Sequence, residues 1–339
     1  MTNKLKQRNH WLDIVRATAI ILVVNCHIAS SQTEHGSQDL WLNVLGLGGH
    51  GVDLFFVLSG WLLGSLLLEE ARTTGKIDVG RFWKRRWLRT LPAYYTVLTL
   101  TLIQTAWQGR FHLDQLSYFL FLQSYLYELT PFFSVAWSLC VEEHFYLLIA
   151  PAVLWTRGRR KRSVLILLLF LLIPAILRYI GLFGNLSETH VRLDQCASGV
   201  TLAFIRIHLP EVWKKLIKSL PILASIAFLL FTVCILQRLQ LASGSPTLLT
   251  FTFISLVFVA FAEYSEWWKS GIRIPGAEYI ATRSYSIYLL HVEAIAAAKH
   301  LEVSNFWARA IFIWLFSFFL AEFLYRCVEQ PFMKRRDPK

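Results

Sequence analysis

Long apolar blocks, separated by short polar and basic segments, run through nearly the whole chain. Residues 163–177 carry no charged side chain, and residues 306–325 carry only Arg309 and Glu322. A helix needs about 20 mostly apolar residues to cross a hydrocarbon layer of about 30 Å. The pattern therefore predicts an all-α, polytopic membrane protein with about ten transmembrane helices, at 12–31, 50–68, 91–107, 136–156, 163–183, 195–207, 217–236, 246–262, 279–300 and 306–326.

Basic residues gather on one side of this predicted topology. With both termini in the cytoplasm, the cytoplasmic segments hold 25 of the 34 Lys and Arg residues, whereas the opposite segments hold four. Because Lys and Arg favour the cytoplasmic side, this asymmetry sets the orientation of the chain. It also accounts for most of the net charge of +12, so the basicity does not require a nucleic-acid partner. We expect a multi-pass protein in contact with membrane lipid.

The whole chain is predicted to form one integral-membrane domain over residues 1–339, with a short basic cytoplasmic tail at 333–339. Residues 4–31 also resemble a signal peptide, but their apolar run is longer than usual and many spans follow, so we expect an uncleaved first helix. The five cysteines lie in or beside apolar blocks without metal-ligand spacing. This pattern predicts buried free thiols and no metal site.

Two ionisable residues share one face of the first predicted helix. Arg16 and His27 are eleven residues apart, which is three turns plus about 20° and about 16 Å along the axis. Ionisable residues inside a span usually mark a pathway or a site. A cation near the cytoplasm suits the phosphates of a donor, and an imidazole suits proton transfer. The spacing leaves a second interpretation open, in which Arg16 snorkels to headgroups and His27 bonds a neighbouring helix.

Further charged candidates flank the third and fourth spans. Arg85 and Arg89, one helical turn apart, would form a basic strip with Arg86 that binds either donor phosphates or anionic lipid headgroups. The fourth span opens with Glu142 and Glu143. Glu142 is a candidate for orienting the His27 imidazole or for binding a substrate hydroxyl, and helix capping is the alternative.

Four other polar residues are weaker candidates for substrate binding. Asp53, near the start of the second span, can cap the helix or pair with a cation. On the outer side, Arg192 and Asp194 can form a local ion pair or meet an acceptor. His291 can be a simple interhelical hydrogen-bonding group.

Together these segments resemble the acyltransferase-3 family, multi-span transferases that O-acylate bacterial glycans and related acceptors. The motifs occur in order along nearly the whole chain: 12–17 with the Arg16–His27 spacing, 51–60, 82–92, 137–143, 192–199, 285–291 and 328–332. Cys140 departs from the serine that the family often has in the motif around Trp137. We expect no extracytoplasmic hydrolase-like domain of the kind that some members carry, and therefore direct transfer.

The resemblance implies an acyltransferase of a bacterial inner membrane. Its donor would be acyl-CoA, foremost acetyl-CoA, entering from the cytoplasm. Its acceptor would be a hydroxyl of a glycan, a lipid-linked sugar or a small hydroxylated molecule. The resemblance also implies that His27 and Arg16 matter most, followed by Glu142. The alternative is a proton-coupled secondary transporter that uses His27, Glu142 and Asp53 as a relay, although the sequence shows no internal repeat of the kind typical of transporters.

Overall fold

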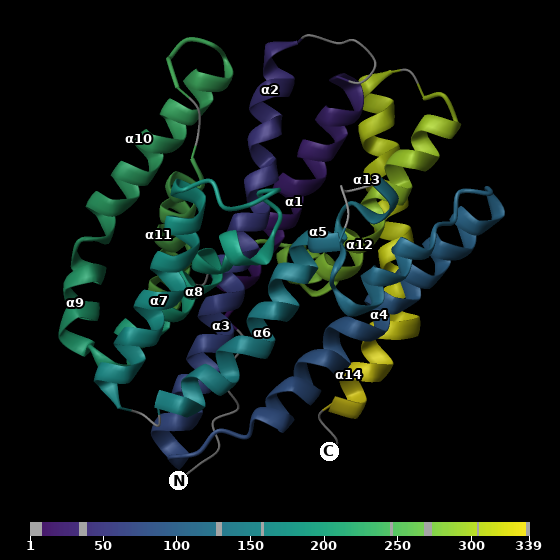
Figure 1. The fold of residues 1–339 in the computed structure, drawn as a ribbon. Coiled ribbons are helices and arrows are strands. Elements are labelled where there is room, and N and C mark those ends of the chain that lie inside the picture. The colour runs from purple at the N-terminus through teal and green to yellow at the C-terminus, as the bar shows by residue number, and fades with distance from the viewer. Residues whose placement is uncertain are drawn as a thin grey trace. The chain divides into compact units, whose positions relative to one another are not determined.

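The computed structural model describes residues 9–33, 39–126, 131–156, 159–244, 247–267, 273–303 and 305–336. Within these ranges the regular secondary structure is helical, which confirms the predicted all-α membrane fold (Figure 1). Several of the basic residues behind the predicted orientation, among them Lys4, Arg157 and Lys269, lie outside the described residues.

Each of the ten predicted spans coincides with a helix. These are α1 (His10–Thr33), α3 (Gly51–Thr74), α4 (Val79–Trp107), α6 (Ala136–Thr156), α7 (Arg160–Tyr179), α8 (Leu193–His208), α10 (Leu220–Arg238), α11 (Leu248–Trp267), α12 (Ala277–His300) and α13 (Phe306–Leu324). Among the described residues, six helical segments are long and apolar enough to cross a membrane, and Leu248–Tyr264 is a shorter apolar helix. The 16 residues of α8 rise only about 24 Å, and α4 and α12 carry several charged side chains.

Short helical elements connect these spans. They are α2 (Leu40–Gly46), η1 (Leu47–His50), η2 (Leu113–Leu120), α5 (Gln123–Leu126), η3 (Pro131–Phe133), η4 (Thr189–Val191), α9 (Pro210–Lys218), η5 (Tyr325–Glu329) and α14 (Gln330–Arg336). Three of them, η2, α5 and η3, lie between the predicted spans 91–107 and 136–156. There Tyr118 is buried, and this burial raises the pKa of its phenol to about 12.

The chain divides into two compact units. Unit 1 comprises residues 1–58 and 209–284, and unit 2 comprises residues 59–208 and 285–339. In unit 1, α1 packs against η1, α2 and α11, and α10 packs against α11. In unit 2, α7 packs against α8, and α4 packs against α6 and α14. The single domain predicted over the whole chain stays a prediction.

Glycines allow unusually close helix contacts in both units. In unit 1, Gly48 and Gly51 lie against the α1 backbone, where an added Cβ would meet Leu22 O at 2.2 Å and Ala19 O at 2.5 Å. In unit 2, Gly60 and Gly64 of α3 lie against Cys196 and Val200 of α8. Small residues four apart are a common means of close packing between membrane helices. Gly48 and Gly51 therefore allow a close contact with α1, and Gly60 and Gly64 allow one with α8.

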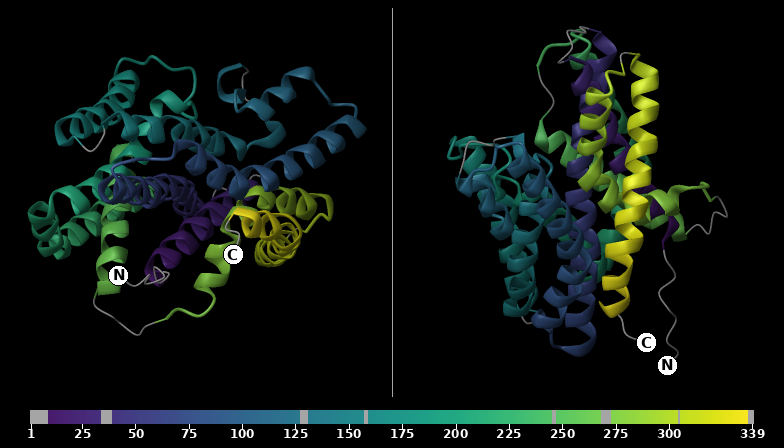
Figure 2. Two further views of the ribbon diagram at one scale, coloured as in Figure 1. Left: turned by 90° about the horizontal axis from the view of Figure 1, so that it is seen from below. Right: turned by 90° about the vertical axis from the view of Figure 1, so that its right-hand side faces the viewer.

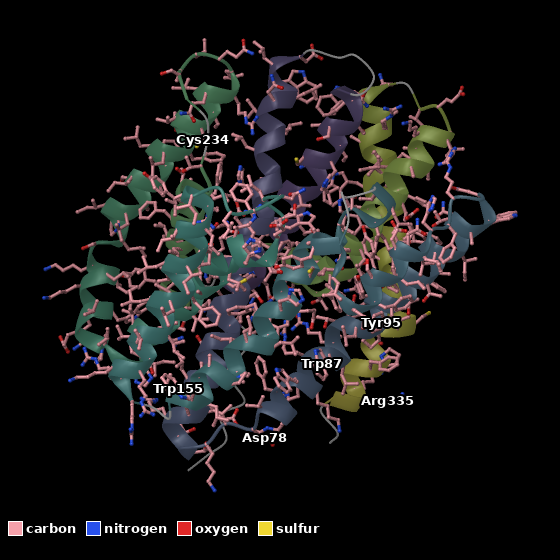
Figure 3. All side chains as sticks on the ribbon, in the orientation of Figure 1. Asp78, Trp87, Tyr95, Trp155, Cys234 and Arg335 are labelled. Atoms are coloured by element: carbon pink, nitrogen blue, oxygen red, sulfur yellow. The ribbon has the colours of Figure 1, made fainter. Side chains whose placement is uncertain are left out.

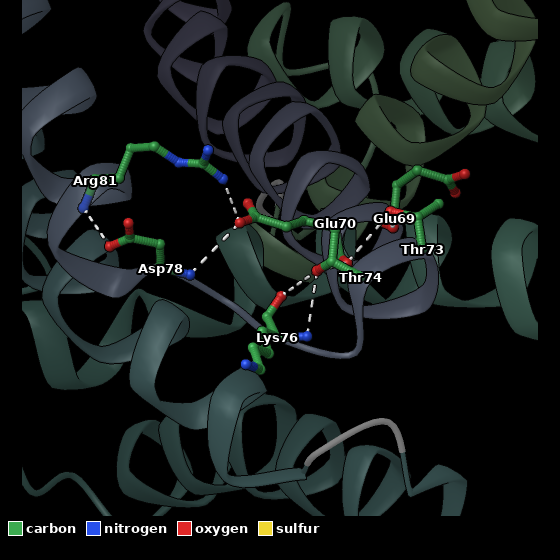
Figure 4. Close-up of polar contacts among 7 residues, drawn as sticks. All are labelled: Glu69, Glu70, Thr73, Thr74, Lys76, Asp78 and Arg81. Atoms are coloured by element: carbon green, nitrogen blue, oxygen red, sulfur yellow. Dashed lines mark hydrogen bonds and ion pairs between the residues drawn. The ribbon is translucent and has the colours of Figure 1, made fainter. Parts of the chain in front are cut away.

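A polar turn joins α3 to α4 at one end of unit 2 (Figure 4). Asp78 caps α4 by accepting a hydrogen bond from Arg81 N at 2.9 Å, and the Arg81 guanidinium pairs with Glu70. Thr74 Oγ1 closes the turn through the main chain of Lys76. In this way the start of α4, which carries the basic strip, is held to the end of α3.

Several predicted cytoplasmic positions gather at one end of unit 2. Figure 3 shows Asp78, Trp155 and Arg335 toward the same end, which is the lower one in that view. Helix α13 continues through the π-helical turn η5 into α14, so Phe306–Arg335 forms one long helix (Figure 2). The predicted basic tail therefore begins as helix at 333–336, and 337–339 lie outside the described residues.

Replacing Gly60 tests the close contact between α3 and α8. A Cβ at Gly60 would lie 1.9 Å from Cys196 O and 2.8 Å from Cys196 C, and main-chain atoms cannot move aside without shifting a helix. We expect Gly60→Ala to destabilise the protein by about 1–3 kcal/mol or more. The measurement is the thermal unfolding midpoint in detergent. Gly46→Ala is the control, because nothing lies within 4 Å of a Cβ there. Equal midpoints for both variants would contradict this packing.

Candidate active site

Arg16 and His27 both lie on α1, as predicted, and each has a local hydrogen bond. Arg16 Nη1 lies 3.3 Å from Asp13 Oδ1, and its side chain is 17% exposed. His27 Nδ1 lies 3.1 Å from the carbonyl oxygen of Val23. A carbonyl can only accept, so Nδ1 carries the hydrogen and the lone pair of the neutral ring lies on Nε2. The half-buried imidazole thus has a defined tautomer in which Nε2 can take up a proton.

A second imidazole in unit 1 was missed by sequence reasoning. His50, the last residue of η1, donates from Nδ1 to Asp53 Oδ2 at 2.6 Å, and the Asp53 carboxylate is buried. The His50 ring stacks on Phe251 at a centroid distance of 3.5 Å. Asp53 therefore pairs with an imidazole. The available signal was the three-residue spacing at a helix start, which places both side chains on one turn.

In unit 2, Tyr146 connects a cation to a carboxylate. Arg86 Nη2 donates to the Tyr146 hydroxyl at 2.9 Å, and this hydroxyl donates to Glu142 Oε2 at 2.8 Å. Ser59 Oγ lies 2.9 Å from the same hydroxyl. The Arg86 guanidinium also lies over the Tyr146 ring, 4.5 Å from its centroid. Helices α3, α4 and α6 together build this Arg86–Tyr146–Glu142 network.

The adjacent carboxylate, Glu143, joins the same interior from another face of α6. Thr90 Oγ1 donates to Glu143 Oε1 at 2.8 Å, and the Tyr285 hydroxyl donates to Thr90 O at 2.9 Å. Arg86 interacts electrostatically with both glutamates. Because they are the seventh and eighth residues of α6, both lie beyond the first turn that a capping residue would serve. An interior cation with two carboxylates is costly inside a membrane and is characteristic of functional sites.

The three arginines of the basic strip all lie on α4, but they differ in exposure. Helix α4 begins at Val79 and runs through Pro92, so the basic segment belongs to the same helix as the predicted span. Arg85 is exposed, whereas Arg86 and Arg89 are half-buried. Among the described residues, Arg86 Nε has no hydrogen-bond partner, so this guanidinium keeps an unused donor.

Three of the four weaker candidates, Arg192, Asp194 and His291, lie in unit 2 and have different partners. Asp194 forms a two-point pair with Arg178, at 2.9 Å and 2.5 Å. Arg192 donates to Leu186 O at 2.8 Å and to Gln195 Oε1 at 3.1 Å, and it lies over the Trp137 ring. His291 is fully buried and bonds Tyr288 O at 2.8 Å. These contacts favour structural roles for Asp194 and His291.

The cysteines and the acidic residues define no metal centre in the described part of the chain, where no group of three metal-ligating side chains occurs. All five cysteines are free thiols, as predicted. Four of them are buried or half-buried, whereas Cys327 is exposed, so the prediction that all five thiols are buried was wrong for Cys327. Cys26 donates to Gly46 O at 3.4 Å.

Replacing Asp194 tests its pairing with Arg178. Asp194→Asn leaves the Arg178 guanidinium, which is 14% exposed, without its countercharge. We expect a loss of about 3–5 kcal/mol in the free energy of unfolding, because removing one partner of a buried pair leaves the other uncompensated. The thermal unfolding midpoint measures this loss. The control is Glu211→Gln, which removes an exposed pair with Lys214 and should leave the midpoint unchanged. An unchanged midpoint for Asp194→Asn would show that the pair is not structural.

These helices and their interior ionisable network define a polytopic membrane protein with a polar site within its spans. The acyltransferase-3 family, described as an acyltransferase domain, matches residues 9–326, and the chain belongs to this family. Membership confirms the resemblance seen in the motifs and favours the transferase over the transporter. No solved structure matches the chain.

Curated relatives extend the comparison. The chain is 28% identical to the O-acetyltransferase OatA of Staphylococcus aureus (strain NCTC 8325 / PS 47), over 96% of this chain and 57% of that protein. It is 27% identical to the peptidoglycan O-acetyltransferase OatA of Listeria monocytogenes, over 95% of this chain and 55% of that protein. The chain therefore spans a little more than half the length of these relatives.

Proposed function

We propose that this protein transfers an acyl group, foremost acetyl, from cytoplasmic acyl-CoA to a hydroxyl group of a glycan. Family membership supports the reaction class, and the names of the relatives support an acetyl donor and a glycan acceptor such as peptidoglycan. Lipid-linked sugars and small hydroxylated molecules are the other acceptors that this chemistry would fit.

The observation that carries the proposal is the tautomer of His27. With Nδ1 donating to Val23 O, the neutral ring carries its lone pair on Nε2, which is the atom that would take up a proton. In the proposed step, Nε2 takes the proton of the acceptor hydroxyl while its oxygen attacks the thioester carbonyl carbon. The carbon–sulfur bond then breaks, and the proton passes from the imidazolium to the leaving CoA thiolate. An ester and free CoA result, and the imidazole is neutral again. A transient acyl-histidine remains an alternative route.

Glu142 is the second proposed catalytic residue. Tyr146 and Arg86 hold one of its oxygens in place, so a carboxylate is available at a defined position inside unit 2. Tyr146 lies ten residues from each end of α6, which is about 15 Å from either end of the helix. A donor from one side and an acceptor from the other would meet at about this depth. Orientation of the His27 ring by Glu142 stays a prediction.

Donor binding is assigned to basic side chains. Arg16, Arg85 and Arg89 stay proposed ligands of the CoA phosphates, since guanidinium groups bind phosphate through paired hydrogen bonds. Arg86 was predicted to share this role, but its hydrogen bond to the Tyr146 hydroxyl, which in turn donates to Glu142, favours holding the carboxylate instead. The acceptor roles of Asp53, Arg192, Asp194 and His291 likewise stay predictions, and the His50 contact favours a positioning role for Asp53.

Removing the His27 imidazole should abolish most of the activity. A positioned general base contributes about 10²–10⁴-fold to the rate, so His27→Ala should lower kcat by that factor. The measurement is transfer from radiolabelled acetyl-CoA to peptidoglycan by protein reconstituted in lipid, with membrane insertion checked in parallel. Cys26→Ser is the control: the neighbouring thiol has no role in the proposed step, and serine can still donate to Gly46 O. Transfer by His27→Ala at the wild-type rate would rule out the proposed base.

Removing the Tyr146 hydroxyl tests the proposed catalytic role of the Glu142 carboxylate. Tyr146→Phe deletes the link between Arg86 and Glu142, and hydrogen bonds to charged groups contribute about 1.5–3 kcal/mol. We expect kcat to fall about 10-fold or more, with little change in KM for acetyl-CoA. Tyr288→Phe is the matched control, because it deletes another buried hydroxyl that bonds Ser138 Oγ and Val135 O. If both variants lose the same activity, the effect is one of packing and the special role of Tyr146 is wrong.

A further inference from the structure

Two outer segments of unit 2 bring aromatic and imidazole rings together. Tyr125 of α5 stacks on His190 of η4, with centroids 5.8 Å apart and an angle of 27° between the rings. The same tyrosine lies 6.3 Å from the ring of His144 on α6. We call Tyr125, His144 and His190 the outer platform. Tyr125 and His190 lie in short segments that the charge pattern places away from the cytoplasm, and His144 is the ninth residue of α6.

The platform is accessible and rigid. Tyr125 is 46% exposed, and the His190 side chain is 35% exposed. His190 N donates to the Tyr125 hydroxyl at 3.3 Å, and His190 Nε2 donates to Leu182 O at 3.1 Å. Glu188 holds the same loop by accepting from the main-chain N–H groups of Gly184 and Asn185. The rings are therefore held in place before any ligand arrives, which lowers the entropic cost of binding.

The polar groups around the rings distinguish this patch from lipid-facing surface. Exposed leucines on η2, such as Leu116 and Leu120, offer only hydrocarbon, as expected at a membrane boundary. On the platform, two imidazoles border the tyrosine, and the Glu188 carboxylate lies 3.4 Å from His190 Nε2. Because His190 Nε2–H is committed to Leu182 O, Nδ1 of the neutral ring can accept a hydrogen bond. An exposed aromatic face bordered by hydrogen-bonding groups suits an amphipathic ligand.

We propose that the outer platform binds a pyranose ring of the acceptor glycan. The apolar C–H face of a sugar would pack on Tyr125, and its hydroxyls would bond the imidazoles. This inference rests on the proposed function, because it assigns the acceptor site of that reaction. His144 supports the connection, since it contacts Thr189 Oγ1 at 2.8 Å and follows Glu142 by two residues on α6. The platform and the proposed catalytic carboxylate therefore lie at a similar depth along α6, about 3 Å apart along its axis, on different faces of the helix.

The test uses the full chain in lipid nanodiscs, with acetyl-CoA and soluble, uncrosslinked peptidoglycan strands. Losing an aromatic contact worth about 0.5–1.5 kcal/mol corresponds to about 2- to 10-fold in affinity. Tyr125→Ala should therefore raise KM for the strands by that factor and leave KM for acetyl-CoA unchanged. Tyr125→Phe keeps the ring and should stay close to wild type. Tyr179→Ala, which removes a 91% exposed tyrosine at the outer end of α7, is the matched control.

The outcomes separate the platform from the proposed function. If wild-type protein acetylates the strands and Tyr125→Ala has an unchanged KM, the platform is wrong and the function stands. Equal losses in the Ala and Phe variants would show that the hydroxyl merely ties the loop to α5, which also overturns the inference. If wild-type protein transfers no acetyl group to the strands, the glycan acceptor fails, and the platform fails with it.

Discussion

A charged side chain inside a hydrocarbon layer is stable only when it is paired or fully hydrogen-bonded, and this requirement governs the interior of both units. Arg86 is accompanied by Tyr146 and two glutamates, Arg178 by Asp194, and Arg16 by Asp13. An isolated guanidinium or carboxylate at these positions would cost several kcal/mol. Pairing thus explains why these residues can be kept within spans, and it also limits how far each can move.

Close helix packing determines which partners can meet. Helix α3 has glycines at the positions where another backbone approaches, so its first turn contacts α1 in unit 1 and its second half contacts α8 in unit 2. A side chain at either contact would collide with main-chain atoms of the facing helix. The hydroxyl of Ser59, next to Gly60, then lies within hydrogen-bonding distance of Tyr146. The glycine run therefore serves the polar network as well as the packing.

Local residue spacing predicted much of this arrangement. It could not predict which residues from distant segments of the chain become partners. The ten helices, the shared face of Arg16 and His27, and the free cysteines follow from periodicity and composition. Asp53 was expected to cap its helix or to pair with a cation, but His50 was not identified as a partner. Arg178 and Asp194 meet across a loop whose path no local pattern encodes. Similarly, the spacing predicted that Arg85 and Arg89 share a face. The hydrogen bond from Arg86 to Tyr146 of α6 joins two distant segments and could not be predicted from spacing.

Helix α6 presents two polar faces, each formed by residues four apart in the sequence. Residues four apart share a face, so Ser138, Glu142 and Tyr146 all meet hydroxyl or guanidinium partners in the interior. Cys140 and His144, also four apart, form a second face that contacts Thr189 of the outer loop. A ligand held on the second face and a carboxylate held on the first are linked by one rigid backbone. In the proposed reaction, α6 would hold a glycan on its second face at a fixed distance from the Glu142 carboxylate on its first face.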